Sequence, residues 1–380
     1  MIYRELGNTG LKVSQIGFGG EWLERHTPEE GVEMIRHAHS LGINILDCWM
    51  SDPQVRSTIG EAFRGCREQW IVQGHFGSTW QNGQYVRTRD MEKCIPAFED
   101  LLTRLETDYI DIGMIHYVDQ ESDWDVIMNG PFIEAMREMK AAGKIRHIGL
   151  STHNPRIAMK AIEAGDIEML MFSINPAYDM LPSSEDVQTM YAEEYDEELG
   201  GIAPERAALY RTCEEKGIGI TVMKPYAAGR LFKAEASAFG VALTPAQCIH
   251  YALTRPGVAS VIAGYDTPQQ ITEACAYEHA APEDLDYATV LANAPRHSCS
   301  GQCTYCGHCK PCPVHIDIAM VNKFYDLAVM QPEVPASVKE HYSALEKNAS
   351  DCIHCGGCET RCPFQVPIVE RMKQAAELFK

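Results

Sequence analysis

Eight of the fifteen cysteines in this 380-residue chain stand in two short runs near its C-terminus. In each run three cysteines follow one another at intervals of three residues, and a fourth comes directly before a proline. Thiolates at this spacing are typical of [4Fe-4S] clusters, with the Cys-Pro cysteine of each run binding the cluster of the other. Tetrahedral zinc is the alternative, although zinc sites usually take two separated Cys-x-x-Cys pairs. We therefore expect two [4Fe-4S] clusters, and the first run departs from bacterial ferredoxin spacing only before its Cys-Pro. One set of ligands would be Cys303, Cys306, Cys309 and Cys362, and the other Cys312, Cys352, Cys355 and Cys358.

The other seven cysteines are scattered singly, and we expect most of them to be small buried apolar residues. Cys48 follows an aspartate and could alternatively be a thiol catalyst, but no basic neighbour in the sequence favours a thiolate there. The seven are Cys48, Cys66, Cys94, Cys213, Cys248, Cys275 and Cys299.

Composition and charge limit the possible partners. Thirty-three basic against fifty-three acidic residues give a net charge of −20, which disfavours nucleic acid and anionic membranes. The N-terminus shows no signal-peptide pattern, and no stretch reaches the ~20 apolar residues that would cross a bilayer. We therefore expect a cytoplasmic protein with a small-molecule substrate.

Ahead of the cysteine runs, short apolar segments alternate with segments of helical periodicity. Eight of each in strict alternation predict an α/β fold of the (β/α)8 TIM-barrel type over residues 1–292. Residues 293–380 would form a small α-rich ferredoxin-like domain, and residues 3–13 a hairpin closing the bottom of the barrel. The expected strands are 15–19, 43–47, 70–74, 109–115, 145–150, 169–174, 218–223 and 258–262; the expected helices are 28–41, 55–64, 89–104, 131–142, 155–164, 204–216, 245–254 and 268–278.

Active sites of such barrels lie at the C-terminal ends of the strands. Asp47, His75 and His116 follow or end the second, third and fourth predicted strands, so all three should meet on one rim. Imidazoles next to a carboxylate are suited to acid-base catalysis near neutral pH. We predict His116 as the main proton donor or acceptor, His75 as the second and Asp47 as the orienting carboxylate.

The chain resembles the aldo-keto reductases, specifically bacterial members with a C-terminal ferredoxin-like domain. The resemblance rests on Gly-Ile-Asn-Ile-Leu-Asp at 42–47, Ile-His at 115–116, Gly-Leu-Ser at 149–151, Met-Lys-Pro at 223–225 and both cysteine runs. It implies an NAD(P)-dependent barrel with an Asp-Tyr-Lys-His tetrad, in which Tyr protonates the carbonyl oxygen as hydride attacks carbon. Asp47 and His116 match the family Asp and His, whereas Asp52 stands at the Tyr position and His75 at the Lys position.

The resemblance also implies a dinucleotide site at the ends of the later strands. Ser151 and Thr152 stand where the family holds the carboxamide, although such a pair could equally cap the following helix. The segment after the eighth strand contains Asp266 and no basic residue, which favours NAD over NADP. The predicted cofactor-binding residues are Ser151, Thr152, Lys224, Gly264, Thr267 and Gln270.

These observations favour an iron-sulfur oxidoreductase acting on a small carbonyl or hydroxyl compound, with an altered tetrad. One alternative is an isomerase or lyase that uses the histidines without nicotinamide. Another is an electron-transfer or partner-binding protein without hydride transfer, and the clusters could relay electrons from a ferredoxin-like donor or simply stabilise the tail. The acidic segment 182–200 would be a lid, a docking surface or a solvated loop.

Overall fold

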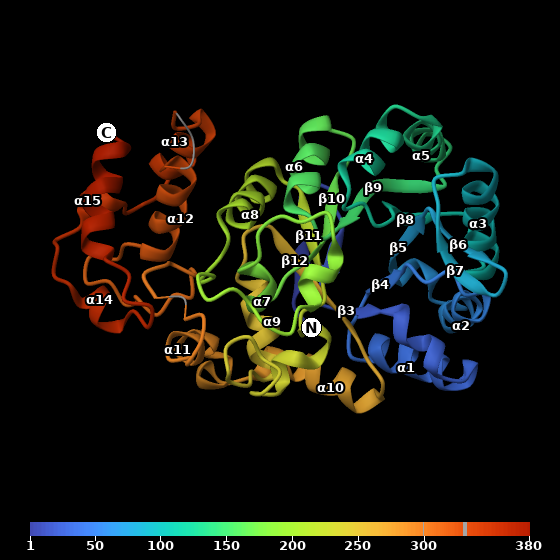
Figure 1. Ribbon diagram of the computed structural model, residues 1–380, viewed down its shortest axis with the longest axis horizontal. Coiled ribbons are helices and arrows are strands. Elements are labelled where there is room, and N and C mark those ends of the chain that lie inside the picture. Colours follow the sequence, from blue (N-terminus) through green and yellow to red (C-terminus); the bar gives the residue numbers. More distant parts are fainter. Residues whose placement is uncertain (299, 330–332) are drawn as a thin grey trace.

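A closed barrel of eight parallel strands forms the centre of the computed structural model (Figure 1), which describes residues 1–298, 300–329 and 333–380. The order around the barrel is β10, β11, β12, β3, β4, β5, β8 and β9. The predicted TIM barrel is thereby confirmed, and all eight predicted strands lie within it. Their bounds are β3 (Ile16–Gly19), β4 (Ile45–Cys48), β5 (Ile71–Phe76), β8 (Ile110–Ile115), β9 (Ile145–Thr152), β10 (Met169–Ser173), β11 (Gly219–Met223) and β12 (Val258–Gly264).

Helices surround the barrel, and local sequence explains where they begin and end. Thr27 and Thr244 each cap a helix that starts with proline, forming reciprocal capping boxes with Glu30 and Gln247. Gly217 ends α8 with a positive φ of 68°, which suits glycine. The helices of this region are α1 (Pro28–Ser40), α2 (Pro53–Phe63), α3 (Met91–Arg104), α4 (Glu121–Met128), α5 (Pro131–Ala141), α6 (Pro155–Ala164), α7 (Pro176–Asp179), α8 (Pro204–Lys216), α9 (Pro245–Leu253), α10 (Pro268–Ala276) and α11 (Tyr287–Ala292).

The N-terminal hairpin of β1 (Tyr3–Glu5) and β2 (Lys12–Ser14) closes the end of the barrel where the strands begin, as predicted. Leu6 and Val13 are fully buried together with residues that face the barrel interior. Gly7 must be glycine because a Cβ atom there would lie 2.2 Å from the carbonyl oxygen of Gly217.

A second hairpin, β6 (Ser78–Gln81) and β7 (Gln84–Arg87), follows β5 at the opposite end of the barrel. Its turn residues Asn82 and Gly83 have φ values of 54° and 77°, as the two central residues of a type I′ turn require. The sequence prediction treated this segment as loop and also missed α4, so both are additions to the expected fold.

The C-terminal module lies beside the barrel and contains α12 (Ile318–Val329), α13 (Ala336–Ser343), α14 (Gly357–Arg361) and α15 (Ile368–Leu378). Figure 1 shows it at one end of the molecule, next to α8 and α11. Polar contacts join α8 to the module: Arg211 donates to the Tyr305 hydroxyl at 3.1 Å, and Lys323 pairs with Glu214. The boundary between residues 292 and 293 stays a prediction, and Cys299 lies outside the described residues. Within the described part of the chain, no helix is long and apolar enough to cross a membrane.

Candidate functional site

The three predicted catalytic residues meet at the C-terminal rim of the barrel, although their side chains come from three different strand ends. Asp47 lies in β4, His75 in β5, and His116 directly after β8. The Nε2 atom of His75 is 2.9 Å from Oδ1 of Asp47, and its Nδ1 is 2.8 Å from Nδ1 of His116. The exposed fractions of Asp47, His75 and His116 are only 1%, 2% and 4%, so all three are shielded from bulk water.

Tyr85 extends this chain of hydrogen bonds toward the surface. Its hydroxyl lies 2.6 Å from Nε2 of His116, and the side chain is half-buried. Burial raises the pKa of Tyr85 to about 12, so the phenol is protonated at neutral pH. The sequence prediction did not include Tyr85 among the catalytic residues, and the signal it missed is the Asn82-Gly83 hairpin that carries this residue.

The order of groups restricts where protons can sit. The Asp47 carboxylate only accepts, so Nε2 of His75 carries a hydrogen. The two Nδ1 atoms share one further hydrogen, and whichever ring holds it decides whether His116 donates to Tyr85 or accepts from it. Burial lowers the pKa of His116 well below its ordinary value, and the nearby charge of His75 adds to this shift. His116 therefore stays neutral and can pass a proton between its neighbours.

Several neighbours hold these groups in place. Trp49 stacks on His116 with 5.8 Å between ring centroids, and its ring meets Tyr85 edge-on at 5.1 Å. Arg89 donates to the backbone carbonyl of His116 at 2.8 Å, and Gln73 donates to Oδ1 of Asp47 at 2.8 Å. The side chains of the predicted site are thus fixed by packing and hydrogen bonds within the protein itself.

Asp52 and Cys48, near Asp47 in the sequence, lie outside the chain of hydrogen bonds from Asp47 to Tyr85. Asp52, at the position of the family tyrosine, caps α2 by accepting from the backbone N–H of Gln54 at 2.6 Å. Cys48 is buried, and burial raises the pKa of its thiol to about 12, which disfavours the thiolate that nucleophilic attack requires.

Of the two hydroxyls predicted to hold a carboxamide, only Ser151 is without a hydrogen-bond partner among the described residues. Thr152 donates to Oδ1 of Asp119 at 2.9 Å. The alternative in which the Ser-Thr pair caps α6 is wrong, because Asn154 accepts from the N–H of Arg156 and is the cap.

A second Asp-His pair lies nearby. Asp119 also accepts from Nδ1 of His153 at 2.9 Å. Burial alone would raise the pKa of Asp119, but the hydrogen bonds from His153 and Thr152 outweigh it and lower the pKa. Sequence reasoning did not anticipate this pair, although Asp119 and His153 follow the neighbouring strands β8 and β9 at the same rim.

The predicted dinucleotide residues at the ends of β11 and β12 lie on the same rim. Lys224 follows β11 with a φ of 56°, and its carbonyl accepts from Asn175. Thr267 caps α10, so its hydroxyl accepts from the N–H of Gln270 at 3.3 Å. Gly264 leaves room for the Trp22 ring, since a Cβ atom there would lie 3.1 Å from that ring.

The segment after β12 has a basic neighbour after all. Arg25, at the end of the short 3-10 helix η1 (Gly20–Arg25), lies 3.6 Å from Oδ1 of Asp266 and stacks over Trp22. Because Arg25 is about 240 positions away in sequence, local reading of the segment could not find it.

The eight clustered cysteines gather in two groups within the module. Cys312, Cys352, Cys355 and Cys358 line one small cavity, together with apolar side chains. Cys309 interacts electrostatically with the thiols of Cys306, Cys358 and Cys362, and Cys303 with that of Cys306. Four soft thiols around one cavity fit one predicted cluster, and the mutual influence of Cys306, Cys309 and Cys362 is consistent with the other.

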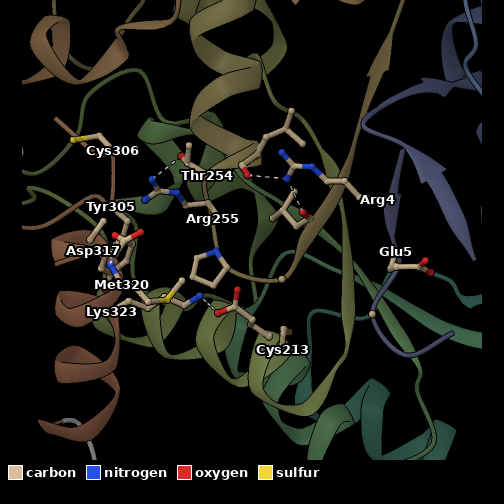
Figure 2. Close-up of a pocket in the computed structure, with 18 of the residues that line it drawn as sticks. Arg4, Glu5, Cys213, Thr254, Arg255, Tyr305, Cys306, Asp317, Met320 and Lys323 are labelled. Carbon is tan, nitrogen blue, oxygen red and sulfur yellow. Dashed lines mark hydrogen bonds and ion pairs between the residues drawn. The ribbon is translucent and has the colours of Figure 1, made fainter. Parts of the chain in front are cut away.

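The two groups differ in exposure. Cys355 is exposed, as are the neighbouring Ile353 and His354. The other group faces the barrel, where Cys306 lines a cavity of about 600 Å³ (Figure 2). Barrel residues of that cavity, including Gly217 and Val258, stand where β11 and β12 begin, away from the catalytic rim.

The acidic segment 182–200 connects the rim with the start of the module. Its last residues bond the module: the carbonyl of Leu199 lies 2.7 Å from Nδ1 of His297, and that of Gly200 accepts from Gln302 at 3.4 Å. Arg230, which follows β11, donates to the carbonyl of Ala192 at 2.7 Å. The segment is therefore tied to both parts, whichever of its three predicted roles applies.

Known proteins resemble this chain in both parts. The aldo/keto reductase family model matches residues 15–242, and a 4Fe-4S dicluster domain model matches residues 302–367. An aldo-keto reductase of Bacillus subtilis, YhdN, is 32% identical over 160 residues, covering 40% of this chain and 47% of YhdN. L-galactose dehydrogenase of Arabidopsis thaliana is 30% identical over 156 residues, covering 39% and 47%.

The chain thus spans about half the length of these curated relatives. The structure of an aldo-keto reductase from Bacillus halodurans in its holo form superposes with a TM-score of 0.59 at 23% identity, covering 75% of this chain and 94% of that one. At that identity the likeness concerns the fold. Since the family model matches more than half of its residues, this chain belongs to the aldo/keto reductase family and carries a C-terminal 4Fe-4S dicluster domain.

Proposed function

We propose that the protein is an oxidoreductase that interconverts a small carbonyl compound and its alcohol, with an altered tetrad. The observation that carries this proposal is the chain of hydrogen bonds from Asp47 through His75 and His116 to Tyr85. His75 takes the place of the family lysine, and Tyr85, from the β6–β7 hairpin, supplies the phenol that Asp52 cannot. The proton donor has thus moved to another element of the fold.

The steps of proton transfer follow from the atoms in this chain. In the charged state His75 is an imidazolium held by Asp47, and neutral His116 donates from Nε2 to the Tyr85 oxygen. Tyr85 gives its proton to the developing alkoxide and takes one from His116, which takes one from Nδ1 of His75. The substrate oxygen gains one proton, His75 loses one, and oxidation of an alcohol runs the same transfers backward.

Nicotinamide, when bound, would supply or accept the hydride. We propose that it lies along the ends of β9 to β12, where the free Ser151 hydroxyl would hold the carboxamide and Lys224, Gly264, Thr267 and Gln270 would line the dinucleotide. Thr152 would act through Asp119 rather than by direct contact, because its hydroxyl is already used. Asp266 and the ion pair it makes with Arg25 favour NAD over NADP.

We propose that the eight module cysteines hold two [4Fe-4S] clusters, which supply one-electron transfer. The exposed Cys355 loop is suited to exchange with a ferredoxin-like protein, since short distances to the surface favour electron exchange. An isomerase or lyase would use the same proton relay without nicotinamide, so cofactor binding separates the two possibilities.

The test is a titration of anaerobically purified holoprotein with NADH and NADPH, followed by turnover with small aldehydes, ketones and alcohols. L-galactose belongs in this panel because one relative is named as its dehydrogenase. We expect NADH to bind, and Tyr85→Phe or His116→Ala to lower kcat by about 10²–10⁴-fold.

Tyr117→Phe is the matched control, because the Tyr117 hydroxyl has no hydrogen-bond partner among the described residues although it lies on the same rim. It should keep nearly full turnover. Full activity of Tyr85→Phe would contradict the assigned donor, and absence of NADH and NADPH binding would favour the isomerase or lyase.

A further inference from the structure

Arg255 is a buried cation at the contact between barrel and module. It lies between α9 and β12, and only 3% of its surface is exposed. Its Nη2 donates to the carbonyl oxygen of Thr304 at 2.5 Å and to the Tyr287 hydroxyl at 3.1 Å, while Nε donates to the carbonyl of Tyr251 at 3.2 Å. The guanidinium group is therefore held in one orientation by neutral acceptors.

The remaining donor of Arg255 has no partner. Nη1 is buried and makes no hydrogen bond with any residue that the structure describes. No carboxylate of the described residues lies within ion-pair distance of this guanidinium either. The charge of the buried Asp179 carboxyl acts on Arg255 from beyond that distance, but this carboxyl is bonded by Tyr251 and Tyr210 and paired with Arg206. The Tyr251 ring, whose centroid lies 4.4 Å from the guanidinium carbon, stabilises the cation in part, but the buried Nη1 donor still has no acceptor, which indicates that a further acceptor completes this site.

The backbone that Arg255 holds belongs to the first cysteine run. Thr304 stands between Cys303 and Cys306, and Arg255 and Cys306 line the same cavity. In Figure 2 the guanidinium end of Arg255 points to the side of the cavity where Tyr305 and Cys306 lie. The cluster that Cys306 would help to bind can supply this acceptor, because its thiolates and sulfides are anionic and accept hydrogen bonds from N–H groups.

We propose that Arg255 raises the reduction potential of the cluster held by Cys303, Cys306, Cys309 and Cys362, and so makes it the electron acceptor of the pair. Reduction adds a negative charge to a group that its thiolates already make anionic. A fixed cation in a low-dielectric setting stabilises that added charge, and hydrogen bonds and burial are established controls of cluster potential.

No buried cation equivalent to Arg255 contacts the second group of cysteines among the residues that the structure describes. Arg361 lines its cavity but is exposed, and it donates to the backbone carbonyls of Cys309 and Pro311. Water therefore screens its charge far more than that of Arg255. Arg371, which acts on Cys303, is paired with Asp326 and contributes little net charge.

The consequence is a direction for electrons within the module. The exposed cluster, once reduced by an external one-electron donor, passes that electron to the cluster beside Arg255; the first is oxidised and the second reduced by one electron. This inference concerns the clusters alone and is independent of the chemistry assigned to the barrel rim.

The experiment is an anaerobic redox titration of the holoprotein with dithionite and mediators, followed by electron paramagnetic resonance. Wild-type protein should show two reduction waves. Arg255→Gln, which removes the charge, should lower the ratio of reduced to oxidised cluster in the higher wave at least about tenfold at a fixed potential, or ~59 mV for one electron. The lower wave should move much less.

Two further variants keep the proposal testable if Arg255→Gln loses iron. Arg255→Lys retains the charge and should keep the higher wave near its wild-type position, whereas Arg361→Gln should leave that wave in place. The proposal is overturned if Arg255→Gln with full iron content moves neither wave or both equally. It is also overturned if Arg255→Lys shifts the higher wave as far as glutamine does, because charge would then not be the cause.

Discussion

The catalytic rim and the cysteine module differ in what holds their functional groups together. At the rim, Asp47, His75, His116 and Tyr85 bond one another at 2.6–2.9 Å, and each is fixed by strands or by a hairpin. In the module, the first cysteine run lies entirely in irregular chain, and only the short α14 lies within the second. Four thiols that face a shared cavity make no bond to one another that would keep them there.

This difference teaches which part of the molecule is shaped by its own chain and which by what it binds. The chain from Asp47 to Tyr85 is complete without a ligand, because its donors and acceptors already bond one another. In the proposal above, clusters would join two runs of cysteines that are about 40 residues apart. We therefore expect the two regions to respond differently to loss of metal, to acid and to a change of cofactor charge.

The largest expected effect is on the module after cluster removal. In Cys358→Ser, or after chelation of iron, α14 and α15 should lose their protection from hydrogen exchange, since metal binding free energy becomes folding free energy in such domains. The strands of the barrel should keep theirs. Hydrogen exchange followed by mass spectrometry measures both regions in one experiment.

Cys66→Ser is the matched control, because Cys66 is a half-buried barrel cysteine outside the two runs. It should retain iron and normal protection throughout. Persistent protection of α15 in iron-free protein would show that the packing of Met372 and Ala375 is sufficient, and the comparison between the regions would fail.

Acid should lower the free energy of unfolding of the barrel through protonation at the rim, and this effect should be smaller than that of cluster removal. Burial lowers the pKa of His116 well below its ordinary value. Below about pH 6.5 the His116 imidazole is therefore protonated in the unfolded chain but stays neutral in the folded protein. The free energy of unfolding then falls as the pH falls, by up to ~1.4 kcal/mol per pH unit for one such group.

Urea unfolding at pH 7.5 and 5.5 measures this loss, and fluorescence reports the barrel alone because all five tryptophans precede residue 125. His116→Gln should lose less stability between the two pH values than wild type does. An equal loss in both proteins would mean that other groups, such as His250, whose pKa burial lowers to about 4, carry the acid sensitivity.

The same contrast explains how far the sequence could be read. The barrel strands and the cysteine runs follow from local pattern, because apolar period and ligand spacing are properties of neighbouring residues. The rim triad was predictable because strand ends share one face of a barrel. Tyr85 was missed although Asn82-Gly83 between Thr79-Trp80 and Tyr85-Val86 is a hairpin signal, so a better local reading would have found it.

Other residues lie beyond any local reading. Arg25 meets Asp266 and Arg255 meets Thr304 only through the closure of the barrel and the docking of the module. Each contact joins segments that are at least 49 residues apart, and a single sequence carries no spacing rule for such pairs. For the same reason the sequence showed no basic residue in the segment after the eighth strand, although Arg25 lies beside it in the structure.

The smallest expected effect concerns the preference between NADH and NADPH at the segment after β12. Asp266 lies 3.6 Å from Arg25 and offsets its charge, and both side chains are exposed, so the pair itself contributes little stability. In Asp266→Asn the freed guanidinium should strengthen NADPH binding about three- to tenfold, which corresponds to ~0.6–1.4 kcal/mol, because a 2′-phosphate gains a cation and loses a repelling carboxylate. NADH binding should barely change, and Asp266→Asn combined with Arg25→Gln should return NADPH to its original affinity. Fluorescence titration with both nucleotides measures the preference; equal strengthening of both would mean that Asp266 acts on the dinucleotide backbone, and that the rim selects its cofactor elsewhere.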